Sequence, residues 1–146
     1  MIMREGASGQ DKQAIKILVV DDSNLDRRTL IKTLREHGLD YEIFEASNGE
    51  EALEILSRNY KDIRLIFLDW QMPKMDGMEF MKGVIKVPLT ASIPIVMVTA
   101  SGSEEAQSSA RRVNPKLAGY VAKPYQSDYL INVISPCLKK IEENTN

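Results

Sequence analysis

Short apolar runs alternate along the chain with amphipathic stretches. Three runs of four consecutive apolar residues stand out, namely Ile17–Val20, Leu65–Leu68 and Ile95–Val98. A strand buried on both faces produces such a run, as in a parallel sheet that is covered by helices. Tyr41–Phe44 is mixed with charge and Tyr120–Ala122 is short. These two segments have the pattern of edge strands.

The stretches between the predicted strands have apolar residues at helical spacing. Each stretch follows a residue type that caps helices, and the candidate caps are Ser23, Asn48, Asp76, Ser103 and Ser127. Five strands alternating with five helices predict right-handed crossovers and an α/β fold with a doubly wound parallel sheet. Pro136 lies within the last apolar stripe. Because proline cannot donate a backbone hydrogen bond, we expect the last helix to kink or end there.

A chain of 146 residues has the usual length of one domain. We expect a flexible N-terminal tail at residues 1–14, one domain over residues 15–142 and a C-terminal tail at residues 143–146. The net charge of -2 does not indicate a nucleic acid or membrane partner. The single cysteine, Cys137, suits a reducing compartment, and no apolar run has the length of a membrane span. We therefore expect a cytoplasmic protein.

Chemically active side chains follow four of the predicted strands. Asp21 and Asp22 come after the first strand, Asp69 after the third, Thr99 after the fourth and Lys123 after the fifth. In an open parallel sheet, ligands bind outside the carboxyl ends of the strands. Each residue alone has an ordinary explanation, such as a helix cap, a turn, a strand end or a solvated lysine. Their shared position at strand ends favours a common site.

Three gathered carboxylates require a cation or must take up protons. Two of them about 4 Å apart repel by roughly 4 kcal/mol at an effective dielectric constant near 20. Oxygen ligands without histidine or cysteine favour a hard ion such as Mg²⁺. A metal ion beside a nucleophilic carboxylate is typical of phosphoryl transfer, in which a lysine also neutralises the transferred oxygens. In that chemistry the hydroxyl of Thr99 is suited to donate a hydrogen bond to one of those oxygens.

Four segments together resemble the receiver domain of two-component response regulators, of the stand-alone type found in chemotaxis. The segments are Leu18–Ser23, Leu68–Gly77, Pro94–Ala100 and Tyr120–Tyr125. The resemblance extends over roughly Ile15–Ile141. It implies a flavodoxin-like fold with five parallel strands in the order 2-1-3-4-5 and five helices.

The resemblance also implies an acceptor and a metal site. Asp69 corresponds to the phosphoacceptor and is itself a metal ligand. Asp22 corresponds to a direct ligand of Mg²⁺, and Asp21 to an acidic partner that acts mainly through water. The backbone carbonyl of Gln71 completes the implied set of protein ligands.

Two further positions are implied to act when the phosphoryl group arrives. Thr99 corresponds to a switch hydroxyl that moves to the phosphoryl group, and Tyr120 to the switch aromatic residue. Lys123 corresponds to a lysine that pairs with the acceptor and then with its phosphate. The peptide bond between Lys123 and Pro124 is implied to be cis.

The resemblance implies partners rather than a small-molecule substrate. The phosphoryl group would come from a histidine kinase or a histidine phosphotransfer protein. Signalling would then proceed by contact with an effector protein, as chemotaxis output or as an intermediate in a phosphorelay. We expect no enzymatic activity beyond the chain's own phosphorylation and dephosphorylation, and a monomer or at most a weak dimer.

Two alternatives use related architecture. A metal-dependent aspartyl phosphohydrolase acting on a small molecule also has a nucleophilic aspartate at a strand end. It needs a second acid two residues further on, where this chain has Gln71, and a substrate-enclosing cap domain. A flavin-binding domain of the same sheet order needs a phosphate-binding loop rich in Gly, Ser and Thr after the first strand. Asp21 and Asp22 at that place would repel the phosphate.

Overall fold

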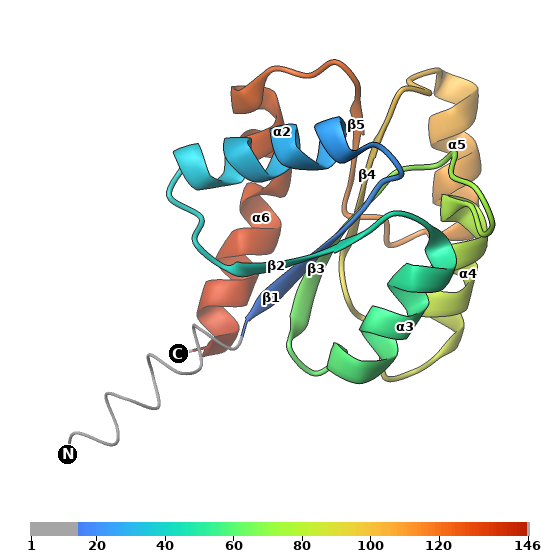
Figure 1. Cartoon of the computed structure of the whole chain (residues 1–146), viewed down its shortest axis with the longest axis horizontal. Helices are drawn as coiled ribbons and strands as arrows, with labels where there is room; N and C mark the ends of the chain where they lie inside the picture. Colours follow the sequence, from blue (N-terminus) through green and yellow to red (C-terminus); the bar gives the residue numbers. More distant parts are fainter. Residues whose placement is uncertain (1–14, 146) are drawn as a thin grey trace.

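The computed structural model describes residues 15–145. Strands and helices alternate throughout, as Figure 1 shows. In chain order they are β1 (Lys16–Val20), α2 (Asn24–Glu36), β2 (Glu42–Ala46), α3 (Gly49–Asn59), β3 (Ile63–Leu68), α4 (Gly77–Lys86), β4 (Ile95–Thr99), α5 (Glu104–Val113), β5 (Gly119–Ala122) and α6 (Ser127–Thr145). The tail expected at residues 1–14 lies outside the described residues.

The five strands form one parallel sheet in the order β2-β1-β3-β4-β5. This order and the α/β class confirm the fold that was predicted. In the register of the sheet, Leu18 of β1 lies between Phe44 of β2 and Ile66 of β3. The strands at the two edges are β2 and β5, and the charge in the first segment and the shortness of the second had predicted these positions.

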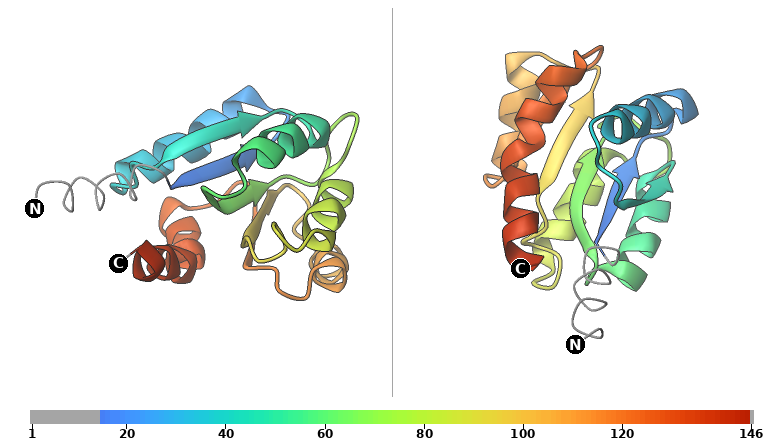
Figure 2. Two further views of the ribbon diagram at one scale, coloured as in Figure 1. Left: turned by 90° about the horizontal axis from the view of Figure 1, so that it is seen from below. Right: turned by 90° about the vertical axis from the view of Figure 1, so that its left-hand side faces the viewer.

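Helices cover both faces of the sheet, with α2 and α6 on one face and α3, α4 and α5 on the other (Figure 2). Side chains of a strand point alternately to the two faces. Ile17 and Val19 therefore enter the core shared with α2 and α6, whereas Leu18 and Val20 enter the core shared with α3 and α4. Burial on both faces explains why the central strands are continuous apolar runs.

Four helices begin at the caps that were predicted. The side chains of Ser23, Asn48, Asp76 and Ser103 each accept a hydrogen bond from the backbone N–H three residues further on. Ser127 is instead the first residue of α6, because the amide of Leu130 already bonds the carbonyl of Gln126. The caps place the starts of α2, α4 and α5 after the carboxyl ends of their preceding strands.

The last helix runs through Pro136 to Thr145. Of the two outcomes expected at Pro136, an end of the helix is therefore wrong. Residues 143–145, where a C-terminal tail was expected to begin, belong to this helix. Buried residues lie on both sides of the proline, including Ile134, Cys137 and Ile141. Their burial offsets the roughly 3 kcal/mol cost of an internal proline. Neither α6 nor any other helix within residues 15–145 is long and apolar enough to cross a membrane.

Candidate functional site

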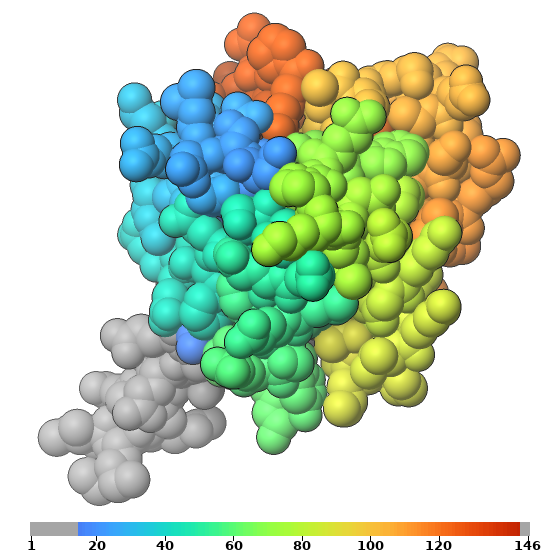
Figure 3. Space-filling view, turned by 45° about the vertical axis from the view of Figure 1, so that its right-hand side comes forward, coloured from blue at the N-terminus to red at the C-terminus, as the bar shows by residue number. Residues whose placement is uncertain are grey.

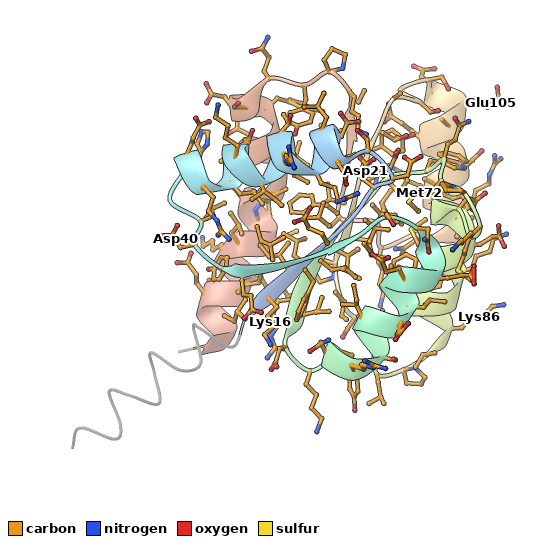
Figure 4. The ribbon with its side chains drawn as sticks, viewed as in Figure 1. Lys16, Asp21, Asp40, Met72, Lys86 and Glu105 are labelled. Carbon is orange, nitrogen blue, oxygen red and sulfur yellow. The ribbon has the colours of Figure 1, made fainter. Side chains whose placement is uncertain are left out.

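Three aspartates gather at the carboxyl edge of the sheet. One carboxylate oxygen from each of Asp21, Asp22 and Asp69 lies within 4.8 Å of the others. Asp21 and Asp69 are buried, whereas Asp22 is exposed. Figure 4 shows Asp21 at the same end of the sheet as Met72, which follows β3, and opposite Lys16 at the start of β1.

Adjacent parallel strands account for this gathering. Val20 and Leu68 are paired in the register of β1 and β3, so the residues that follow them must be neighbours. The amide of Asp69 donates a hydrogen bond to the carbonyl of Val20 at 2.9 Å. The amide of Asp21 bonds Ala46 at the end of β2 at 3.0 Å. The backbone therefore sets the spacing of the carboxylates.

Lys123, after β5, is the cation of this cluster. Its Nζ donates to Asp21 Oδ2 at 2.6 Å and to Asp26 Oδ2 at 2.7 Å, and it lies 3.6 Å from Asp69 Oδ2. Burial alone would lower the pKa of Lys123, but the two hydrogen bonds and the charge of Asp69 outweigh burial and raise it. Lys123 therefore remains an ammonium, and it is shared among three carboxylates.

Asp26 was missed by the sequence analysis. It lies three residues after the cap Ser23, and an acidic residue at that place is an ordinary feature of a helix start. A usable signal was its position in the first turn of the helix that begins directly after Asp21 and Asp22, at the same edge of the sheet. Only the arrangement of α2 against the segment after β5 brings it to Lys123.

The carboxyl group of Asp69 is held in a polar but enclosed setting. Its Oδ1 accepts a hydrogen bond from the amide of Trp70 at 2.8 Å. Burial raises the pKa of Asp69 above its ordinary value, and the negative charge of Asp21 adds to the rise. The Thr99 hydroxyl, Lys123 and the Trp70 amide oppose the rise without cancelling it. The folded protein therefore holds an ionised Asp69 at a cost in stability.

The segment between β3 and α4 encloses the side of the site on which Asp69 lies. Gly77 packs so closely on the backbone of Asp69 that a Cβ at position 77 would lie 2.1 Å from the carbonyl oxygen of Asp69. The amide of Gly77 bonds the carbonyl of Trp70 at 2.7 Å. Gln71 lies on the exposed side of this segment, and its carbonyl as a metal ligand stays a prediction. Figure 3 shows the segment at the surface between the start of α2 and α5.

Thr99 and Tyr120 lie on the neighbouring strands β4 and β5. Thr99 ends β4 and is 1% exposed. The Tyr120 ring is also buried, and its hydroxyl donates a hydrogen bond to the carbonyl of Ser101. Burial raises the pKa of Tyr120, and the charge of Asp69 contributes. The structure thus holds the tyrosine in an inward position.

A cavity of about 520 Å³ adjoins the cluster on the side of α2 and α6. Asp21, Asp69 and Lys123 line its polar part, and Leu30 and Phe67 belong to its apolar part. The peptide bond between Lys123 and Pro124, two residues that line this cavity, is cis, as the resemblance implied. The acidic cluster therefore opens beside a mainly apolar cavity rather than onto a flat surface.

The donor set fits a hard divalent cation. The three clustered residues offer only carboxylate oxygens, the ligands that Mg²⁺ prefers. Burial raises the pKa of Asp69, and the charge of Asp21 adds to the rise although Lys123 opposes it. A cation among the three carboxylates would offset their mutual repulsion.

Comparisons with known proteins agree with this geometry. The family model of the response regulator receiver domain matches residues 17–135. A chemotaxis protein CheY homolog of Campylobacter jejuni is 35% identical over 116 residues, which are 80% of this chain and 86% of that protein. The sensor histidine kinase CheAY of Helicobacter pylori is 34% identical over 84% of this chain and 15% of its own length. The structure of Vibrio cholerae chemotaxis protein CheY4 at low pH is 30% identical, with a TM-score of 0.73 over 84% of this chain and 98% of that one.

We expect Gly77→Ala to destabilise the protein by about 1–3 kcal/mol, because the added methyl group forces the segment after β3 away from the Asp69 carbonyl. Gly83→Ala is a matched control in the same helix, since its Cβ would meet Leu53 at an ordinary 3.8 Å. The control should gain about 0.5–1 kcal/mol from the higher helix propensity of alanine. Urea unfolding of both variants measures the difference, and equal stabilities would contradict the prediction.

We expect Asp69→Asn to be more stable than wild type near neutral pH when a chelator removes divalent metals. A carboxyl whose pKa is raised by folding loses stability as the pH rises from its unfolded through its folded value. The gap should therefore shrink as the pH falls towards about 3.8. Urea unfolding followed by circular dichroism at several pH values measures it, with the exposed Asp40→Asn as control. A gap that is absent near neutral pH, or that grows on acidification, would contradict this expectation.

Proposed function

Because this chain belongs to the response regulator receiver domain family, we propose that it accepts a phosphoryl group on Asp69 and thereby controls a contact with another protein. As a receiver domain similar to chemotaxis response regulators, it has a role in signalling. The observation that carries the assignment of the acceptor is the enclosed Asp69 carboxylate. It lies beside two further aspartates and 3.6 Å from the Lys123 ammonium.

The proposed chemistry is a transfer between two nucleophiles. A carboxylate oxygen of Asp69 attacks the phosphorus of a phosphohistidine on a partner, the P–N bond breaks, and an acyl phosphate forms. The histidine nitrogen leaves with its electron pair and takes up a proton. Lys123 and the Thr99 hydroxyl, which lie close to the acceptor, neutralise charge on the transferred oxygens. Attack of water on the phosphorus then breaks the acyl phosphate, releases inorganic phosphate and restores the Asp69 carboxylate.

Mg²⁺ is the cofactor that we propose for this site. Asp22 and Asp69 would hold it directly with the backbone carbonyl of Gln71, and Asp21 would act mainly through water. The division between the two adjacent aspartates is supported by their surroundings. Asp21 already accepts hydrogen bonds from Lys123 and from the amide of Ser23, whereas Asp22 faces solvent. When bound, the metal supplies positive charge opposite the oxygens of the phosphoryl group.

Thr99 and Tyr120 form the switch in this proposal. Movement of the Thr99 hydroxyl toward a phosphoryl group on Asp69 would alter the packing beside Tyr120 on the next strand. The hydrogen bond from Tyr120 to Ser101 ties that ring to the loop before α5. A phosphoryl-dependent shift between two positions of these groups would therefore reach the surface formed by α5, β5 and α6. Arg111, Arg112 and Lys116 are exposed there.

The partners follow from the chemistry and the family. We propose a histidine kinase or histidine phosphotransfer protein as the donor, and an effector protein as the target. The likeness to part of a sensor histidine kinase supports a role in histidine-to-aspartate transfer. A net charge of -2 supports a protein partner over nucleic acid or a membrane surface. In this proposal the protein acts in the cytoplasm as a monomer or weak dimer. It does not turn over a separate substrate.

The phosphohydrolase alternative receives no support from the comparisons. The position where such an enzyme needs its second acid is Gln71, which is exposed and uncharged. The flavin-binding alternative shares the sheet order, but Asp21 and Asp22 make the loop after β1 repulsive to a phosphate.

We expect wild-type protein to gain one acid-labile phosphoryl group per chain when it is incubated with acetyl phosphate and Mg²⁺. Asp69→Asn should abolish the gain, because an amide oxygen is too weak a nucleophile for this transfer. Asp40→Asn, which alters an exposed aspartate outside the cluster, serves as the control and should behave as wild type. Intact-protein mass spectrometry measures the stoichiometry. Unchanged phosphorylation of Asp69→Asn would exclude Asp69 as the acceptor.

We expect Mg²⁺ to change the fluorescence of Trp70, the single tryptophan, because it follows the acceptor directly. Asp22→Asn should weaken the apparent affinity at least about tenfold, since one charged ligand of the few that bind Mg²⁺ is lost. The titration uses Asp62→Asn as control, because Asp62 precedes β3 at the other end of the sheet. Identical titrations of wild type and Asp22→Asn would remove Asp22 from the ligand set.

A further inference from the structure

We propose that Asp26 is a positioning residue that holds Lys123 back from the acceptor and so slows phosphorylation of Asp69. This inference rests on the proposed function. It adds a fourth acidic residue to the site, one that is supplied by the first turn of α2.

The distances around Lys123 carry the proposal. An ammonium has three N–H donors. Two of them are used at 2.6 Å and 2.7 Å by the carboxylates of Asp21 and Asp26. The separation of 3.6 Å from Asp69 Oδ2 is longer than a hydrogen bond. The resting structure therefore directs the ammonium to the α2 side of the cluster, although it already lies within ion-pair distance of the acceptor.

The usual role of an acid at this helix position is filled by another residue. In a capping box, the side chain three residues after the cap accepts a hydrogen bond from the backbone N–H of the cap residue. Here the amide of Ser23 instead donates to Asp21 Oδ1 at 2.9 Å. The Asp26 amide donates to the Ser23 hydroxyl, but the Asp26 carboxylate is directed to Lys123. The Asp26 side chain thus binds Lys123 and also adds negative charge to the first turn of the helix.

The exposure of the partners sets the size of the effect. The Asp26 side chain is 41% exposed, against 7% for Asp21 and 11% for Asp69. A partly exposed ion pair is weak, so Asp26 restrains Lys123 without trapping it. A phosphoryl group on Asp69 adds negative charge at the acceptor and would draw the ammonium away from Asp26. Before that transfer, Asp26 competes for the cation that stabilises the transferred oxygens.

The test compares three variants of the full chain with wild type. Asp26→Asn keeps the size of the side chain and removes its charge, and Asp26→Glu keeps the charge. Glu36→Gln is a matched control, because it removes one exposed negative charge from the last turn of the same helix. The rate of phosphorylation by acetyl phosphate with Mg²⁺ should rise about two- to fivefold in Asp26→Asn. Asp26→Glu should give a rate closer to wild type, and Glu36→Gln should match wild type.

A second readout follows the lysine itself. The side-chain ammonium signal of Lys123 in ¹H–¹⁵N NMR spectra should shift and exchange faster with water in Asp26→Asn, but not in Glu36→Gln. A change confined to helix stability would leave this signal in place. A rate in Asp26→Asn that equals or falls below wild type would overturn the proposal, and so would a faster rate with an unchanged Lys123 signal. Wild type that takes up no phosphoryl group would instead refute the proposed function, while the NMR comparison would still test the contact.

Discussion

Electrostatic crowding around one ammonium is the constraint on which this site depends. The carboxylates of Asp21, Asp26 and Asp69 all contact Lys123, and Asp22 adds a further negative charge at the rim. Lys123 brings one positive charge to these four carboxylates, and the charge of Asp21 adds to the rise in the pKa of Asp69 that burial causes. Two changes would lower the repulsion in such a cluster. A second cation could bind, or Lys123 could move from one carboxylate to another. Both changes are those that phosphoryl transfer requires.

The fold holds these like charges together because its stability comes from elsewhere. Two apolar layers, one on each face of the sheet, fix β1, β3 and β4 side by side. Backbone hydrogen bonds at the strand ends then set the positions of the carboxylates, as the bond from the Asp69 amide to the Val20 carbonyl does. The close contact of Gly77 with the Asp69 carbonyl completes the enclosure of Asp69. The burial of apolar side chains on both faces of the sheet thus offsets the repulsion among the carboxylates.

Much of this arrangement was predictable, because it depends on strand order and on residues directly after strands. Asp21, Asp22, Asp69 and Lys123 were identified in this way, and the sheet order was implied by resemblance. The course of the last helix was not predictable on these grounds. The helix continues through Pro136 because apolar residues on both sides of it are buried, and local propensity contains no information on that packing.

The sequence by itself determined the class of the fold, the caps of four helices and the residue types at the carboxyl edge. Apolar periodicity and the hydrogen bonding of helix caps are properties of short segments, and the alternation of strands with helices indicates parallel strands, which explains this success. Only the tertiary structure decided how Lys123 is divided among its partners. Asp26 and Lys123 are 97 residues apart in the chain, and their contact depends on the packing of α2 against the segment after β5. No local pattern encodes that distance, because it is set by the cores on both faces of the sheet.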